Sequence, residues 1–156
     1  MRSSLLQDRG ERTFVVVLDK GDEVVAGLTA FAAREHLRAS HLTAIGALHD
    51  VTLGYFDRDR RDYTRIPLAE QVEVLSLLGV VTLEDAKPKL HAHIVVGRAD
   101  GTTRGGHLLE AHVWPTLEVI VKESPRHLQR RTDPETGLPL IDLRGGGRAP
   151  SRAIPA

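Results

Sequence analysis

The sequence predicts a mostly β domain with one main helix, and three features of the chain support this class. Residues 21–39 form the only stretch with the length and the one-sided apolar pattern of a long helix. After residue 41, short alternating or continuous apolar runs separated by turn-forming residues are typical of strands. Between two of these runs, Asp100-Gly101 predicts a tight hairpin turn, because glycine tolerates the positive φ angle that such turns need.

The first half of the chain is expected to contain a buried strand, the helix and then a series of strands. Residues 13–18 predict the first strand, and the helix follows the turn at Gly21-Asp22 and runs to about Ala39. Further strands are expected at residues 42–48, 51–55, 63–68 and 70–82, with Pro67 indicating a sheet edge or a strand end. The apolar run 77–81 indicates a fully buried strand or, alternatively, a subunit interface.

The strand after the predicted hairpin is expected to break at Trp114-Pro115 and to resume over residues 116–121. Trp114 is the only tryptophan and is expected in the core or in an interface. Residues 123–132, which include an exposed His127, predict a short helix, and residues 138–143 predict a last strand. We therefore expect a single domain at residues 1–143 and a flexible Gly-, Arg- and Pro-rich tail at residues 144–156.

Three of the eight histidines lie in the predicted hairpin. His91 and His93 are two residues apart, so both rings project from one face of a strand, with their backbones about 7 Å apart. That spacing suits two imidazoles that bind one metal ion. Whether a third ring, that of His107, joins them depends on the register of the hairpin.

A strict two-residue turn would make His107 face away from the other two histidines. One extra residue on the returning strand would place His107 opposite Val95 and diagonal to His93, on the same face as both histidines. Gly105-Gly106 is a natural site for such a bulge, since glycine accepts the unusual backbone angles of a bulge. A longer loop would have the same effect. We therefore predict that His107 turns toward His93.

Three histidines with an open position are the pattern of a catalytic or ligand-accepting zinc site, whereas structural zinc sites usually have four protein ligands. The chain has no cysteine, which excludes disulfides and thiolate ligands and leaves histidines and carboxylates for any metal. The alternative is that each histidine is an ordinary packed or solvent-facing side chain. Glu110 and His112, further along the same strand, are weaker candidates for a fourth ligand or a hydrogen-bond partner of the ligands.

The residues around these histidines resemble the signature of the plant-and-prokaryote conserved domain, the PPC domain. The resemblance runs from about Phe14 to about Leu143 and consists of ordered blocks, which are more specific together than any one alone. The blocks are Ala44-Ile45-Gly46-Ala47, Leu53-Gly54-Tyr55-Phe56, Glu70-Gln71-Val72-Glu73-Val74-Leu75-Ser76, Leu90-His91-Ala92-His93, Gly97, Asp100-Gly101 and Gly105-Gly106-His107-Leu108-Leu109-Glu110.

The resemblance implies an α+β fold with a mostly antiparallel sheet, and assembly as a homotrimer. In plants the domain follows an AT-hook, which binds AT-rich DNA, and the family is labelled DNA-binding for that reason. Prokaryotic members are usually the bare domain, and we expect this chain to be one of them. Some members bind a metal ion through histidines that match His91, His93 and His107, whereas the plant proteins generally lack this set.

The composition disfavours DNA binding. Lys plus Arg and Asp plus Glu number 21 each, so no overall positive field attracts a phosphate backbone. The tail carries Arg144, Arg148 and Arg152 as weak nucleic-acid candidates, but it has no Arg-Gly-Arg, and an inert solubilising tail is the simpler interpretation. We find neither a signal-peptide pattern at the start nor an apolar run of membrane length, and we expect a cytoplasmic protein.

Three classes of function remain. The first is a metal-binding domain, most simply with zinc, whose site accepts a small-molecule ligand or regulates the trimer. The second is a hydrolase-like zinc enzyme, in which Glu110 or Glu73, from this or a neighbouring subunit, would act as general base. The third is a DNA-binding or transcription-associated module.

Glu70 and Glu73 are expected as solvated edge residues or near a ligand pocket between subunits. A cupin oxygenase is disfavoured, because no Glu follows His93 closely.

Overall fold

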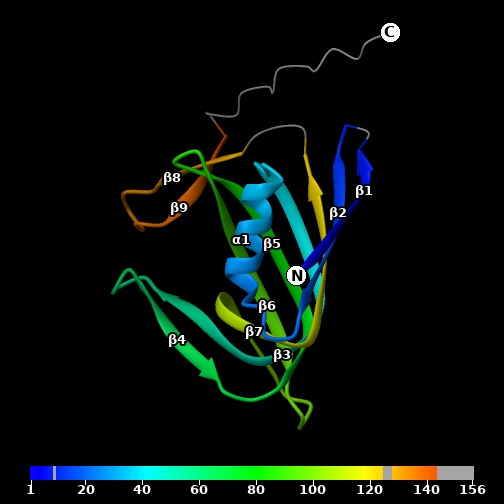
Figure 1. Cartoon of the computed structure of the whole chain (residues 1–156). Coiled ribbons are helices and arrows are strands. Elements are labelled where there is room, and N and C mark those ends of the chain that lie inside the picture. Colours follow the sequence, from blue (N-terminus) through cyan, green and yellow to red (C-terminus); the bar gives the residue numbers. More distant parts are fainter. Residues whose placement is uncertain (9, 125–127, 144–156) are drawn as a thin grey trace.

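The computed structural model describes residues 1–8, 10–124 and 128–143, and in this part of the chain it contains one helix and nine strands (Figure 1). The strands form one sheet with the order β1-β2-β7-β3-β5-β8-β9, while β4 pairs with β3, and β6 pairs with β5 and β7. All pairs are antiparallel except β5 with β8. The mostly antiparallel fold with one main helix is therefore confirmed. The elements are β1 Arg2–Asp8, β2 Arg12–Asp19, α1 Val24–Arg34, β3 Ala39–Asp57, β4 Asp62–Leu68, β5 Val72–Glu84, β6 Lys87–Gly97, β7 Thr103–Glu123, β8 Gln129–Thr132 and β9 Pro139–Asp142.

The helix α1 is shorter than predicted. The carboxylate of Glu23 caps its start by accepting hydrogen bonds from the backbone nitrogens of Val25 and Ala26. The helix ends at Arg34 rather than near Ala39, because His36 has a positive φ of 54°, a left-handed conformation that ends helices. The chain then turns directly into β3.

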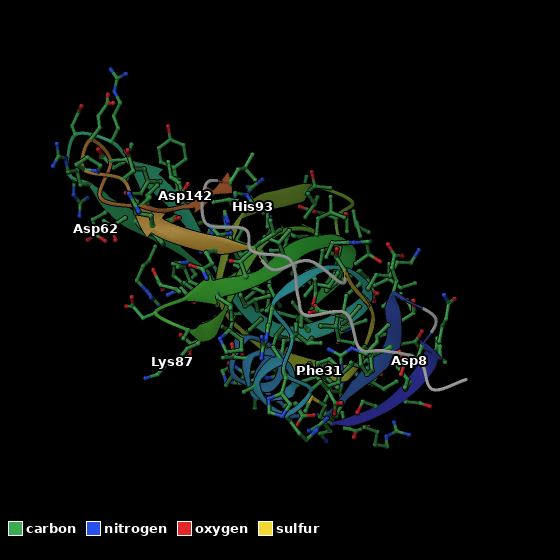
Figure 2. The ribbon with its side chains drawn as sticks, turned by 90° about the horizontal axis from the view of Figure 1, so that it is seen from above. Asp8, Phe31, Asp62, Lys87, His93 and Asp142 are labelled. Carbon is green, nitrogen blue, oxygen red and sulfur yellow. The ribbon has the colours of Figure 1, made fainter. Side chains whose placement is uncertain are left out.

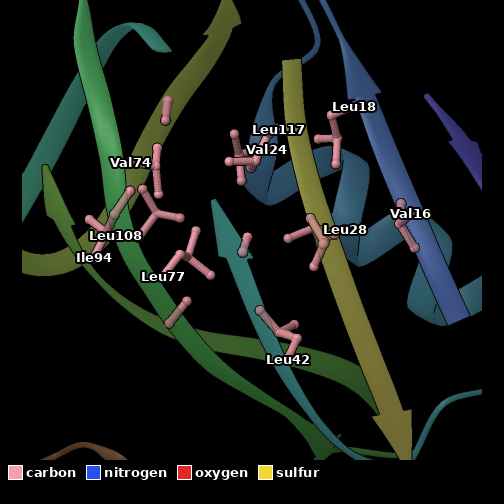
Figure 3. Close-up of a cluster of buried hydrophobic side chains, with 14 of the residues drawn as sticks. Val16, Leu18, Val24, Leu28, Leu42, Val74, Leu77, Ile94, Leu108 and Leu117 are labelled. Carbon is pink, nitrogen blue, oxygen red and sulfur yellow. The ribbon is translucent and has the colours of Figure 1, made fainter. Parts of the chain in front are cut away.

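The helix packs on one face of the sheet and forms the core with it (Figure 1, Figure 3). Leu28 and Phe31 of α1 are buried, together with inward-facing residues of five neighbouring strands. The predicted fully buried run at residues 77–81 is wrong, because its residues alternate: Leu77 is 1% exposed, whereas Leu78 is 59% exposed on the outer face.

Two long strands replace four shorter predicted ones. The expected strands at residues 42–48 and 51–55 are both parts of β3, which is 19 residues long. The predicted break at Trp114-Pro115 is also wrong, since β7 runs without interruption from Thr103 to Glu123. The strand β7 pairs with β3 on both sides of Pro115, which keeps it continuous. Irregularities in the β3–β7 register accommodate the proline. Trp114 is 38% exposed, with the ammonium group of Lys20 lying 3.7 Å from its ring centroid, so it does not lie in the core.

The ends of the described chain differ most from expectation. Strand β1 was not predicted, because all its residues are exposed and give no apolar alternation. Gln129–Thr132 is strand β8 where a short helix was expected, while His127 lies outside the described residues. Arg144, Arg148 and Arg152 lie outside them as well. Within the described part of the chain, strand β4 pairs with β3 alone, which confirms the sheet edge indicated by Pro67. Among the described residues, no helix has the length and apolar character needed to span a membrane.

Candidate metal centre

The β6–β7 hairpin places the three histidines on one face of the sheet. His107 lies directly opposite His93 in the β6–β7 ladder, and the pairing continues without a shift to Gly97 and Thr103. The predicted bulge at Gly105-Gly106, with His107 opposite Val95, is therefore wrong. The alternative prediction, a hairpin loop longer than two residues, accounts for the position of His107 on the same face as His91 and His93. The loop holds three residues, 99–101, and is closed by a hydrogen bond of 2.9 Å from the backbone nitrogen of Arg98 to the carbonyl oxygen of Thr102.

Glycines beside the hairpin allow a close approach of strands rather than a bulge. A Cβ atom on Gly106 would lie 2.9 Å from the carbonyl oxygen of Gly54 on β3. A Cβ atom on Gly54 would lie 2.7 Å from the ring of Tyr63 on β4. The lack of side chains lets the Tyr63 ring stack on His107, with centroids 4.6 Å apart and an interplanar angle of 24°. This stacking fixes the orientation of the His107 ring.

The three rings converge on a common point. The Nε2 atoms of His91 and His93 are 3.2 Å apart, and one ring nitrogen from each of the three histidines lies within 4.8 Å of the others. Two nitrogens bound to one tetrahedral zinc at about 2.0–2.1 Å would lie about 3.3 Å apart. His91, His93 and His107 therefore fit the dimensions of a single divalent metal ion.

The electrostatics of the cluster also suit metal binding. Burial, together with the nearby charges of His91, His93 and Lys89, lowers the pKa of His107 to about 4. Burial and the neighbouring Arg130 and His93 lower the pKa of His91. Both rings are thus neutral at pH 7, the state in which an imidazole binds a metal. The Nδ1 atom of His107 is buried without a hydrogen-bond partner in the described part of the chain, an orphaned polar atom that a bound ion could satisfy.

The acidic candidates lie outside this cluster within one chain. Among the described residues, the only group of His, Asp or Glu side chains with metal-site spacing is the three histidines. The carboxylate of Glu110 lies 3.1 Å from Arg65 instead, and Glu73 is exposed on β5. His112 lies 2.8 Å from Asp50. A general base for the cluster would therefore have to come from another chain, or Glu110 or Glu73 would have to adopt a different side-chain conformation.

A cavity of about 190 Å³ adjoins the histidines. It extends from the cluster toward β4 and the β8–β9 hairpin, the end of the molecule at which Figure 2 labels Asp62 and Asp142. No sequence pattern indicated most of its lining, because β8 follows the cluster by more than twenty residues and, in the described part of the chain, pairs with β5 at a single residue pair. The lining residues are Tyr63, Lys89, Leu90, His91, His107, Arg130, Leu138, Pro139 and Leu140.

Residues 6–125 match the Plants and Prokaryotes Conserved (PCC) domain. The chain belongs to this family. The PCC domain, also abbreviated PPC, covers every strand and helix that positions the histidines, and the family resemblance read from the sequence is confirmed.

Solved structures share the fold of this PCC-domain chain. A PPC protein from Pyrococcus horikoshii is 30% identical with a TM-score of 0.79, and the match covers 90% of this chain and 94% of that one. A metal-containing protein from Archaeoglobus fulgidus is 34% identical with a TM-score of 0.78, over 90% and 98%. A proposed DNA-binding protein from Bacteroides thetaiotaomicron is 27% identical with a TM-score of 0.83, over 91% and 98%.

Curated relatives are longer than this PCC-domain chain. The bifunctional protein GlmU from Synechococcus sp. (strain JA-3-3Ab) is 32% identical over 129 residues, which is 81% of this chain. GlmU from a second Synechococcus strain, JA-2-3B'a(2-13), is 32% identical over 120 residues. The matches span only 20% and 18% of those proteins, so the similarity concerns a small part of each.

Proposed function

We propose that this PCC-domain protein binds one divalent metal ion, most simply zinc, through His91, His93 and His107. The convergence of three imidazoles, with one ring nitrogen of each within 4.8 Å of the others, carries the proposal. The similarity to the metal-containing protein from Archaeoglobus fulgidus supports it. Three protein ligands leave a coordination position open, and in this proposal a small molecule occupies it or the ion regulates the assembly of the protein.

Metal analysis of the purified protein tests this proposal. After dialysis against zinc and then against metal-free buffer, the wild type should retain close to one ion per chain. The double variant His91→Ala/His107→Ala should retain none, and His112→Ala, which changes a nearby histidine outside the cluster, should behave as the wild type. Stoichiometric metal in the double variant would show that other residues are the ligands.

We also propose that the protein assembles as a homotrimer through the outer face of the sheet. Residues directly opposite each other in neighbouring strands share a face, and the register aligns Ile120, Thr43, Leu78 and His93 across four strands. Exposed apolar side chains gather on this face, as expected of a surface that a partner covers. They are Ile45, Leu75, Leu78, Val95 and Ile120, between 38% and 61% exposed. The sequence prediction of an interface near residues 77–81 is consistent with this surface.

An enzyme is the first alternative. A zinc ion with an open position lowers the pKa of bound water or polarises a carbonyl group, and a carboxylate of a neighbouring chain would supply the general base. A screen of ester, amide and phosphate substrates, with and without chelator, tests this function. Turnover that is lost with chelator and in His91→Ala would support it.

DNA binding is the second alternative, and the Bacteroides thetaiotaomicron protein favours it. The equal numbers of basic and acidic residues disfavour it. Titration of a DNA duplex with the protein at two salt concentrations tests DNA binding, because phosphate contacts make the affinity for DNA fall steeply as salt increases. Absence of salt-sensitive binding at micromolar protein would remove this function.

A further inference from the structure

The cavity beside the histidines is lined by basic and apolar side chains. Among the residues that the structure describes, its ionisable lining residues are Lys89, Arg130 and Tyr63, together with His91 and His107 of the cluster, and none of these is acidic. The volume of about 190 Å³ is below the roughly 300–1,000 Å³ of sites for drug-sized ligands, so a ligand of few non-hydrogen atoms fits it.

Arg130 is held rigidly at one wall of this cavity. Its Nε donates to Thr82 Oγ1 at 2.6 Å, and its Nη1 donates to the carbonyl oxygen of Pro139 at 2.6 Å. Thr82 is fully buried, so the guanidinium is anchored to the core sheet on one side and to β9 on the other. A guanidinium fixed in this way loses little conformational entropy when it binds a ligand.

Arg130 retains donors for a ligand. The guanidinium has five N–H groups, and the contacts to Thr82, Pro139 and His91 engage three of them. Two N–H groups, one on Nη1 and one on Nη2, therefore have no partner among these contacts. One N–H donor on each Nη atom of a guanidinium can together bind a carboxylate in bidentate fashion.

The contact between Arg130 and His91 couples the cavity to the histidine cluster. Arg130 Nη2 lies 3.3 Å from His91 Nδ1, and because arginine cannot accept a hydrogen bond, Nδ1 must be the acceptor. If His91 bound a metal through Nε2, which faces His93, its proton would lie on Nδ1. Nδ1 could then no longer accept from Arg130, and the N–H of Nη2 that contacts it would lose its acceptor. Metal binding at the cluster would thus change the hydrogen bonding of Arg130, which ties the cluster to the cavity.

We propose that this cavity binds a small organic carboxylate, with the carboxylate group on Arg130 and the carbon body against the apolar wall. Lys89 stands at the same cavity and adds positive charge, although Glu84 lies 3.3 Å from its ammonium group. The apolar wall suits a short hydrocarbon group better than a fully hydrated inorganic anion. It is formed by Leu90, Leu138, Pro139 and Leu140. The inference rests on the proposed function, because it names the ligand of the same site, and it predicts that metal and carboxylate bind cooperatively.

Calorimetric titration of the full chain with propionate tests the inference, in zinc-loaded and metal-free protein. Propionamide, which has the same shape without the charge, and inorganic phosphate, which has no apolar body, are the comparison probes. Propionate should saturate one site per chain and bind at least about tenfold more tightly than either probe, as expected for charge-assisted hydrogen bonds. Zinc should tighten propionate binding, and propionate should tighten zinc binding by the same factor.

Three variants assign the site. Arg130→Gln should weaken propionate binding about tenfold or more, whereas Arg131→Gln, on the next residue of β8 and outside the cavity, should leave it unchanged. Lys89→Met removes a charge from a partly exposed side chain and should weaken binding without affecting folding, so it tests the site even if Arg130→Gln destabilises the β8–β9 hairpin. Equal propionate affinity in wild type and both cavity variants would overturn the inference. Failure of the wild type to take up zinc would instead overturn the proposed function.

Discussion

His107 of β7 lies directly opposite His93 of β6, and their ring centroids are 5.3 Å apart. This pairing brings residues that are fourteen positions apart in the sequence to one point on the sheet. A shift of one residue in the register would turn the His107 ring to the opposite face. The geometry of the candidate site therefore depends on the three-residue loop between the strands and on the packing of β7 against β3.

Replacement of Gly106 by alanine should destabilise the protein. Its Cβ atom would lie 2.9 Å from the carbonyl oxygen of Gly54, a backbone atom that cannot move aside freely. We expect a loss of about 1–3 kcal/mol in the free energy of unfolding, typical of overpacking. Urea denaturation measures it, with Arg104→Ala on the exposed start of β7 as control. Equal stability of Gly106→Ala and Arg104→Ala would contradict the close approach of the two strands.

The metal-free protein should lose stability as the pH falls from about 6.5 toward 4. The pKa of His107 is about 4 in the folded protein and near 6.5 when unfolded, so in this window the unfolded chain binds a proton that the folded chain does not. The stability contribution of the neutral ring is complete above about pH 6.5. Denaturation at several pH values should show this slope, and His107→Gln should reduce it. An NMR titration that places the His107 pKa near 6.5 would contradict the burial of the ring.

Replacement of Leu78 by lysine should disrupt the proposed trimer. The side chain is 59% exposed on the apolar outer face, and a lysine there would bury a charge in the proposed interface. Leu6→Lys is a matched control, because Leu6 is also 59% exposed but lies on the edge strand β1. Analytical ultracentrifugation should give three chains for the wild type and Leu6→Lys, and fewer for Leu78→Lys. A monomeric wild type would remove the trimer proposal.

The sequence could predict the fold class and the shared face of His91 and His93 because both follow from local periodicity. His91 and His93 share a face in any strand, and Asp100-Gly101 marked the turn correctly. The size of the loop was not predictable, because glycine with a positive φ occurs in both two-residue and three-residue hairpin loops. Periodicity alone could not group His107 with His91 and His93, whereas the family resemblance did. The resemblance depended on several ordered blocks rather than on one motif.

The cavity could not be predicted, because it depends on contacts between distant elements. Arg130 comes from a hairpin whose strand pairing with β5, among the described residues, is limited to one pair of residues, and Tyr63 reaches His107 only because Gly54 has no side chain. The continuity of β7 through Pro115 also depends on a neighbouring strand, β3, which pairs with it on both sides of the proline. The local propensity of Pro115 predicts the end of the strand, but the pairing of β7 with β3 keeps the strand continuous.

X-ray absorption spectroscopy of the zinc-loaded protein tests most directly whether the three imidazoles share one ion. We predict a first shell at about 2.0–2.1 Å whose outer-shell scattering requires three imidazole rings, completed by an oxygen ligand. In His107→Ala, one imidazole should be lost from this shell. A shell made mainly of oxygen atoms, or a spectrum that does not change in His107→Ala, would contradict the account.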